Sequence, residues 1–101
     1  KIISGRKDYT STSAQTLLDQ SVVVTDEETV TANKANKLYI KNLSTDSTEY
    51  ATITINSEDL GRLYAGDWLF IPWSAEDSSA DVKITPSVAT SMKFDYVLVH
   101  E

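Results

Sequence analysis

The chain of 101 residues contains no cysteine, two prolines, three glycines and one histidine, His100. The lack of cysteine excludes disulfides and thiolate chemistry. A single histidine has no second histidine or cysteine with which to form a zinc site, and no G-x-S-x-G nucleophile motif is present. We therefore expect no enzymatic activity, no cofactor and no bound metal ion, and we expect His100 to be a surface or interface residue.

The sequence also lacks a long apolar run and an excess of positive charge. No segment approaches the roughly 20 apolar residues that a membrane-spanning helix needs, so we expect no membrane partner. Fifteen acidic residues against nine basic ones give a net charge of −6. A protein this acidic repels phosphate backbones, which argues against a nucleic-acid partner.

Short motifs that sometimes mark binding sites are present but incomplete. Acidic residues cluster at Asp26–Glu28, Glu58–Asp59 and Glu76–Asp81. A calcium site with Asp77 and Asp81 as ligands would need further oxygen ligands at fixed spacing, and no D-x-D-x-D-G pattern occurs. The sequence Asn42-Leu43-Ser44 has the form of a glycosylation sequon, but one chance match is expected in a chain so rich in serine and threonine.

What the chain does contain is a series of short segments in which apolar and polar residues alternate. The clearest is YATITIN, Tyr50–Asn56, and turn-forming residues separate such segments by roughly 8–12 residues. This pattern predicts an all-β, single-domain antiparallel β-sandwich of seven to nine strands, jelly-roll or immunoglobulin-like. The alternation places eight residues in the core: Leu38, Ile40, Ile53, Ile55, Val82, Ile84, Phe94 and Tyr96.

The N-terminal region is harder to place. Residues 1–13 have little apolar periodicity and are predicted to form an extended N-terminal arm or an edge strand, which leaves residues 14–101 as the sandwich domain. Residues 12–20 fit a short helix as an alternative to a strand.

The segment GDWLFIPW, Gly66–Trp73, concentrates both tryptophans of the chain. Its apolar residues fall on both faces of a strand, which favours a central strand or a subunit contact. Pro72 has no amide hydrogen for a sheet, so the strand is expected to end, or to lie at an edge, near this residue. The alternative is a carbohydrate-stacking platform that uses Tyr64, Trp68 and Trp73.

A subunit interface is also suggested by the two ends of the chain. Val97 and Val99 make the final strand apolar on its second face, and the first residues combine positive charge with two isoleucines. These features predict a homo-oligomer, most plausibly a trimer, anchored partly by the N-terminal arm. The candidate residues for subunit or capsid contacts are Lys1, Ile2, Ile3, Arg6, Lys7, Trp73, Val97 and Val99.

From Lys37 onward, three blocks of sequence are similar in residue pattern and order to those of a known group of proteins. They read LYIKNLSTDSTEYATITI, LGRLYAGDWLFIPW and DVKITPSVATSMKFDYVLVHE. Their order resembles small virion proteins of tailed bacteriophages, especially marine ones. In those proteins, a G-L-x-G-D/E strand that ends in Pro-Trp precedes an I/V-K-h-T-P-S segment and a final strand with an acidic end.

The resemblance implies a β-sandwich with a non-enzymatic structural role. A capsid decoration or cement protein fits the size, with the major capsid protein or another virion protein as its partner. Its location would be the capsid surface of the virion, after assembly in the host cytoplasm. Two alternatives stay open, a tail or fibre component involved in host attachment and a carbohydrate-binding module.

Overall fold

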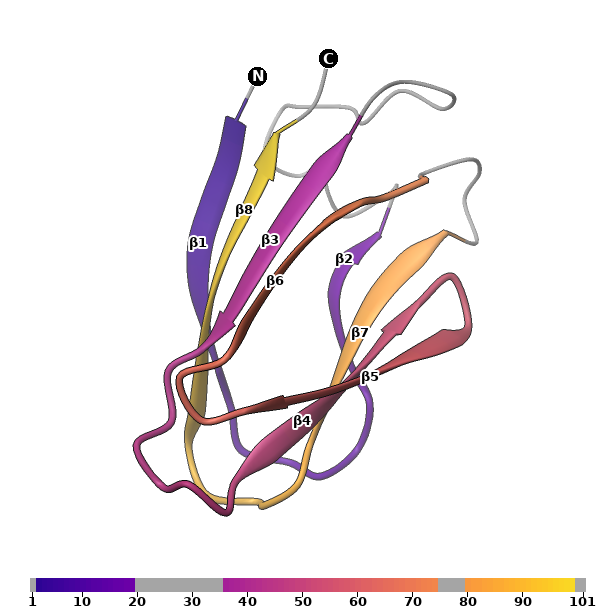
Figure 1. The fold of residues 1–101 in the computed structure, drawn as a ribbon. Coiled ribbons are helices and arrows are strands. Elements are labelled where there is room, and N and C mark those ends of the chain that lie inside the picture. Colours follow the sequence, from indigo (N-terminus) through magenta and orange to yellow (C-terminus); the bar gives the residue numbers. More distant parts are fainter. Residues whose placement is uncertain (1, 20–35, 75–79, 100–101) are drawn as a thin grey trace.

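The computed structural model describes residues 2–19, 36–74 and 80–99, which form eight strands and no helix (Figure 1). The strands are β1 (Ile2–Tyr9), β2 (Gln15–Asp19), β3 (Lys37–Asn42), β4 (Tyr50–Ile55), β5 (Glu58–Tyr64), β6 (Trp68–Pro72), β7 (Asp81–Pro86) and β8 (Met92–Val99). They make two four-stranded antiparallel sheets. The predicted β-sandwich is therefore confirmed.

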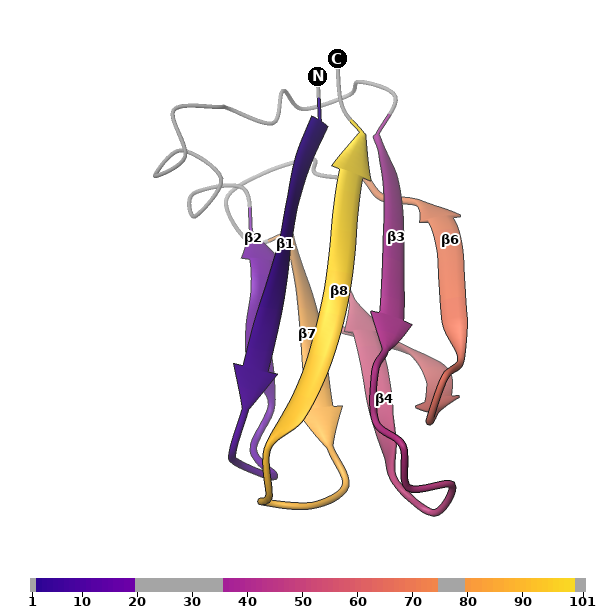
Figure 2. The same ribbon diagram turned by 90° about the vertical axis from the view of Figure 1, so that its left-hand side faces the viewer.

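The order of strands identifies the type of sandwich. One sheet, the front sheet, has the order β1-β8-β3-β6, and the other, the back sheet, has the order β2-β7-β4-β5. Only β4 and β5 are neighbours both in sequence and in a sheet, so almost every connection crosses between the sheets. First pairs with last, second with seventh, and so on inward, which is the jelly-roll arrangement. Figure 2 looks onto the outer surface of the front sheet.

The N-terminal region belongs to the sandwich and is not a free arm. Strand β1 pairs with β8 along its whole length, from Ile2 opposite Val99 to Tyr9 opposite Met92. Of the two interpretations of residues 1–13, the edge strand is the one found for residues 2–9. The alternative of a helix over residues 12–20 is wrong for the part described, because β2 pairs with β7.

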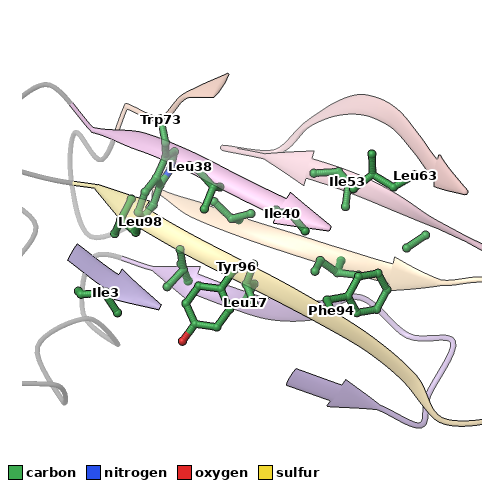
Figure 3. Close-up of a cluster of buried hydrophobic side chains, with 14 of the residues drawn as sticks. Ile3, Leu17, Leu38, Ile40, Ile53, Leu63, Trp73, Phe94, Tyr96 and Leu98 are labelled. Atoms are coloured by element: carbon green, nitrogen blue, oxygen red, sulfur yellow. The ribbon is translucent and has the colours of Figure 1, made fainter. Parts of the chain in front are cut away.

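The core lies between the two sheets, as alternation within the strands predicts (Figure 3). Of the eight predicted core residues, seven are buried, and Ile55 is half-buried and packs against the others. Leu17 and Leu18 are both buried although they are adjacent, because a bulge between Thr16 and Leu18 turns both side chains inward.

Two asparagines fix the turns around this core. The Nδ2 of buried Asn42 donates to the carbonyl of Leu63 at 3.0 Å, and its Oδ1 accepts from the amide of Ser44 at 2.9 Å. Asn56 and Ser57 form the two-residue turn between β4 and β5 with φ of 49° and 69°. Positive φ at both positions is the requirement of a type I′ hairpin. Because both polar atoms of the Asn42 side chain are hydrogen-bonded inside the fold, Asn42 is not presented as a glycosylation site.

Candidate interaction surface

The outer surface of the front sheet, here called the front face, is built from alternate residues of four strands. The register aligns three rows that cross β1, β8, β3 and β6 in that order. The rows are Ile2, Val99, Lys37 and Pro72; Ser4, Val97, Tyr39 and Phe70; and Arg6, Asp95, Lys41 and Trp68. Each of the four strands thus contributes at least one apolar or aromatic residue to the front face, and charged residues lie between them.

Several of these apolar side chains are open to solvent. The exposed fractions are 69% for Ile2, 60% for Trp68, 57% for Phe70 and 40% for Val99. Only two other large apolar side chains among the described residues are comparably exposed, Leu60 and Tyr64 on β5. Exposed apolar side chains gathered on one face mark a candidate site of interaction, because their contact with water is unfavourable.

Strand β6 gives the front face its aromatic character. Trp68 and Phe70 point outward, and Leu69 and Ile71 point inward, half-buried against the core. The Trp68 ring lies 6.2 Å from the Tyr39 ring. Of the two interpretations of this segment, the central strand is wrong, because β6 is an edge strand, and the subunit contact stays a prediction. The expected end of the strand near Pro72 is confirmed. Both faces of β6 are apolar: one face covers the core, and the other is exposed to solvent.

Two predicted interface residues lie inside the core instead. Trp73 is 1% exposed, and its Nε1 donates to the Oδ1 of Asn56 at 3.2 Å. After Pro72 the chain continues along β3, where the amide of Trp73 donates to the carbonyl of Asn36, and the indole turns inward (Figure 3). Ile3 is also buried in the core. Neither side chain is available to a partner.

The predicted carbohydrate platform is not assembled as proposed. Trp68 lies on the front face, Trp73 in the core, and Tyr64 on the outer surface of the back sheet opposite Tyr50. The Tyr64 and Tyr50 rings are 5.3 Å apart, and the Arg62 guanidinium lies 4.1 Å from the centre of the Tyr50 ring. The three residues therefore cannot stack on one sugar.

The basic residues of β1 are in different environments. The Arg6 guanidinium donates two hydrogen bonds to the Asp95 carboxylate, at 2.7 and 3.2 Å. These bonds lower the pKa of Asp95 from its usual value, and they raise that of Arg6. Lys7 is exposed at an inward position of the edge strand, opposite Phe94. A charge there discourages another strand from pairing with the edge.

The front face also differs from the rest of the molecule in charge. Its basic side chains are Arg6, Lys37, Lys41 and Lys93, and its acidic ones are Asp8 and Asp95. Elsewhere in the described ranges acidic residues predominate: Asp19, Asp46, Glu49, Glu58, Asp59, Asp67 and Asp81 stand against Lys7, Arg62 and Lys83. An apolar surface with basic residues thus lies on an otherwise acidic molecule.

A second apolar feature lies at the edge where β5 and β6 face each other. A groove of about 220 Å³ is lined by Ile53, Leu60, Gly61, Arg62, Leu63, Leu69 and Ile71. Leu60 is the extra residue of a bulge between the pairs Ile53–Gly61 and Thr54–Asp59. Neither was predicted, because the bulge depends on the register of β5 against β4 and the groove depends on how the two sheets meet at their edges.

Some predicted features fall outside the described residues, namely Lys1, His100, Asp77 and the cluster Asp26–Glu28. Within residues 2–19, 36–74 and 80–99, no group of three or more histidine, aspartate or glutamate side chains is placed to hold a metal ion. The same residues include no helix that is long and apolar enough to cross a membrane.

Comparison of the chain with models of known protein families and with curated proteins finds no match. The geometry of the front face is therefore the main basis for a functional proposal.

Proposed function

We propose that this protein is a non-enzymatic structural protein that binds neighbouring protein subunits through its front face. In its most specific form it is a capsid decoration or cement protein of a tailed bacteriophage, on the capsid surface. The observation that carries the proposal is the set of exposed apolar side chains on the front face, with Trp68 and Phe70 of β6 at one side and Ile2 and Val99 of β1 and β8 at the other. Exposed aromatic residues are the usual energetic centres of protein–protein interfaces.

The fold and the sequence resemblance both support the virion as the location of this protein. Jelly rolls form many viral capsid proteins, and they also form lectins, so the fold alone is an argument by analogy. The resemblance of the segment from Lys37 onward to phage virion proteins favours the first of these two uses. The major capsid protein, or another virion protein, is then the expected partner.

The test is quantitative mass spectrometry of purified particles from the phage that encodes this chain. We expect the protein at a copy number comparable with that of the major capsid protein. Recombinant protein should also rebind particles from which it has been stripped. A few copies per particle would instead indicate a tail or fibre component, and absence from the particles would contradict the proposal.

A carbohydrate-binding role is the second candidate, supported by one observation. The exposed Trp68 ring and the Tyr39 ring lie together on the front face, near a shallow depression that contains Ser4, Arg6 and Asp95. Aromatic faces beside hydroxyl and carboxylate groups are suited to sugars. Glycan-array binding that Trp68→Ala abolishes would favour this role, and binding that Trp68→Ala leaves intact would exclude this site.

A further inference from the structure

The front face needs a partner that is apolar at its centre and acidic around it. Lys37 lies within its rows between Val99 and Pro72, and Lys41 lies between Asp95 and Trp68. Four basic side chains against two acidic ones, Asp8 and Asp95, leave the front face with a net positive charge, so two front faces packed against each other would repel. The front face is therefore poorly suited to a symmetric contact with itself.

The edge strand β5 has the complementary properties. It carries the two remaining exposed large apolar side chains of the described residues, Leu60 at 53% and Tyr64 at 44%. Glu58 and Asp59 precede Leu60 directly, so carboxylates flank the apolar site. The one cation on the strand, Arg62, lies over the Tyr50 ring and also lines the groove.

The groove beside β5 is large enough for a side chain from the front face. Its volume is about 220 Å³, and its lining includes Leu60, Leu63, Leu69 and Ile71. A dry cavity of roughly 150 Å³ already holds benzene, so an aromatic ring such as that of Phe70 fits here. Strand β5 and the front face together carry every exposed large apolar side chain in the described part of the chain.

We propose that the front face of one copy packs on the β5 edge and groove of a second copy, so that like copies form a closed ring. The contact buries Trp68 and Phe70 of one subunit against Leu60 of the next, and it brings Lys37 and Lys41 near Glu58 and Asp59. It joins two different surfaces, and such contacts form rings when the rotation between copies closes. This inference rests on the proposed structural role and specifies the neighbouring subunit.

The test is sedimentation equilibrium of the full chain from micromolar to millimolar concentration. We expect a mass of at least three chains that reaches a fixed upper limit, and we expect added salt to weaken the assembly because charge pairs flank the contact. A wild type that stays monomeric at all concentrations, or stops at two chains, would overturn the proposal.

Two single variants sharpen the test, because each inactivates one of the two surfaces. Phe70→Lys alters the front face and Leu60→Lys alters the β5 edge, and both side chains are exposed, so both variants should fold. Each alone should be monomeric. An equimolar mixture should form a dimer and nothing larger, because only one intact pair of surfaces remains. A mixture that stays monomeric would contradict the arrangement.

Thr16→Lys is the matched control, since it adds the same charge at an exposed position of β2 in the back sheet. It should assemble like the wild type, and all variants should keep the wild-type melting temperature when measured as monomers. The inference and the proposed function fail separately. A monomer in solution that is abundant on particles would contradict only the ring, and a ring that is absent from particles would contradict only the virion role.

Discussion

Asn42 is a single side chain that holds three segments in place. Its amide group joins the end of β5 to the start of the turn after β3, and its backbone bonds to Gly66 and Asp67 across the turn that leads into β6. The residue is fully buried. The burial of Asn42 was not predicted from the sequence, because an asparagine followed by Leu-Ser is typical of a sequon or a turn and not of a core position.

Replacing Asn42 with alanine should lower the free energy of unfolding by about 1–3 kcal/mol, because the carbonyl of Leu63 is left buried without its donor. Urea denaturation measures the loss. Ser47→Ala, at an exposed turn position, is the control and should change stability little. A loss of only a few tenths for the Asn42 variant would show that water replaces the amide.

Tyr9 should make the protein sensitive to alkali. Its hydroxyl is buried without a hydrogen-bond partner, and burial raises the pKa of Tyr9 from 10.0 to about 12. The unfolded chain therefore loses this proton at lower pH than the folded protein does, so stability falls as pH rises from 10.0 to about 12. Below that range the group has no effect on the pH dependence.

The variant Tyr9→Phe separates this effect from the titration of other groups. At neutral pH it should be as stable as the wild type or more stable, because it removes an unpaired buried hydroxyl. Across the alkaline range its stability should fall less steeply. Identical alkaline profiles for the two proteins would show that Tyr9 is accessible to water.

Among the elements, strand β4 follows local sequence rules and β6 does not. The alternation of β4 predicts its buried side correctly because one face of the strand covers the core and the other carries threonines. In β6 the outward face is also apolar, so alternation cannot tell an edge strand with an exposed face from a central strand. Trp73 follows Pro72, after the strand ends, where strand alternation no longer applies.

The β4–β5 turn offers a stabilising substitution. Ser57 has φ of 69°, a left-handed conformation that is unfavourable for residues other than glycine. Ser57→Gly should therefore raise the free energy of unfolding, by about 1 kcal/mol. Thermal and urea denaturation measure the gain. Gly66→Ala is the opposite case, because Gly66 has φ of 77°, and it should lower the free energy of unfolding. An increase in stability for Gly66→Ala would contradict the argument from backbone conformation.

At the scale of the whole molecule, the sequence predicts the layers and seven of the fifteen buried residues in the described core cluster, but not the surfaces. The two-residue alternation of side chains along each strand determines which residues pack between the sheets. The pairing of β1 with β8, and of β3 with both β8 and β6, brings Ile2, Val97 and Phe70 onto one face. These residues are far apart in the sequence, so no local pattern could have shown that they are neighbours.

Core and front face should respond differently to truncation. Ile53→Ala removes a side chain that is 1% exposed, and it should cost about 2–5 kcal/mol of stability. Phe70→Ala should cost far less in the dilute monomer, because the ring is in water there. Urea unfolding at low concentration compares the two, and equal losses would show that Phe70 is part of the monomer's packing.

The central claim is that another protein subunit covers the front face, and the two tryptophans provide its most direct test. Trp68 is 60% exposed and Trp73 is 1% exposed, so acrylamide should quench the first and spare the second in the dilute protein. Trp68→Phe assigns the quenched component. As the concentration rises, or when particles are added, the quenched component should shrink and its emission should shift to the blue. A Trp68 component that stays fully quenchable under both conditions would contradict the account.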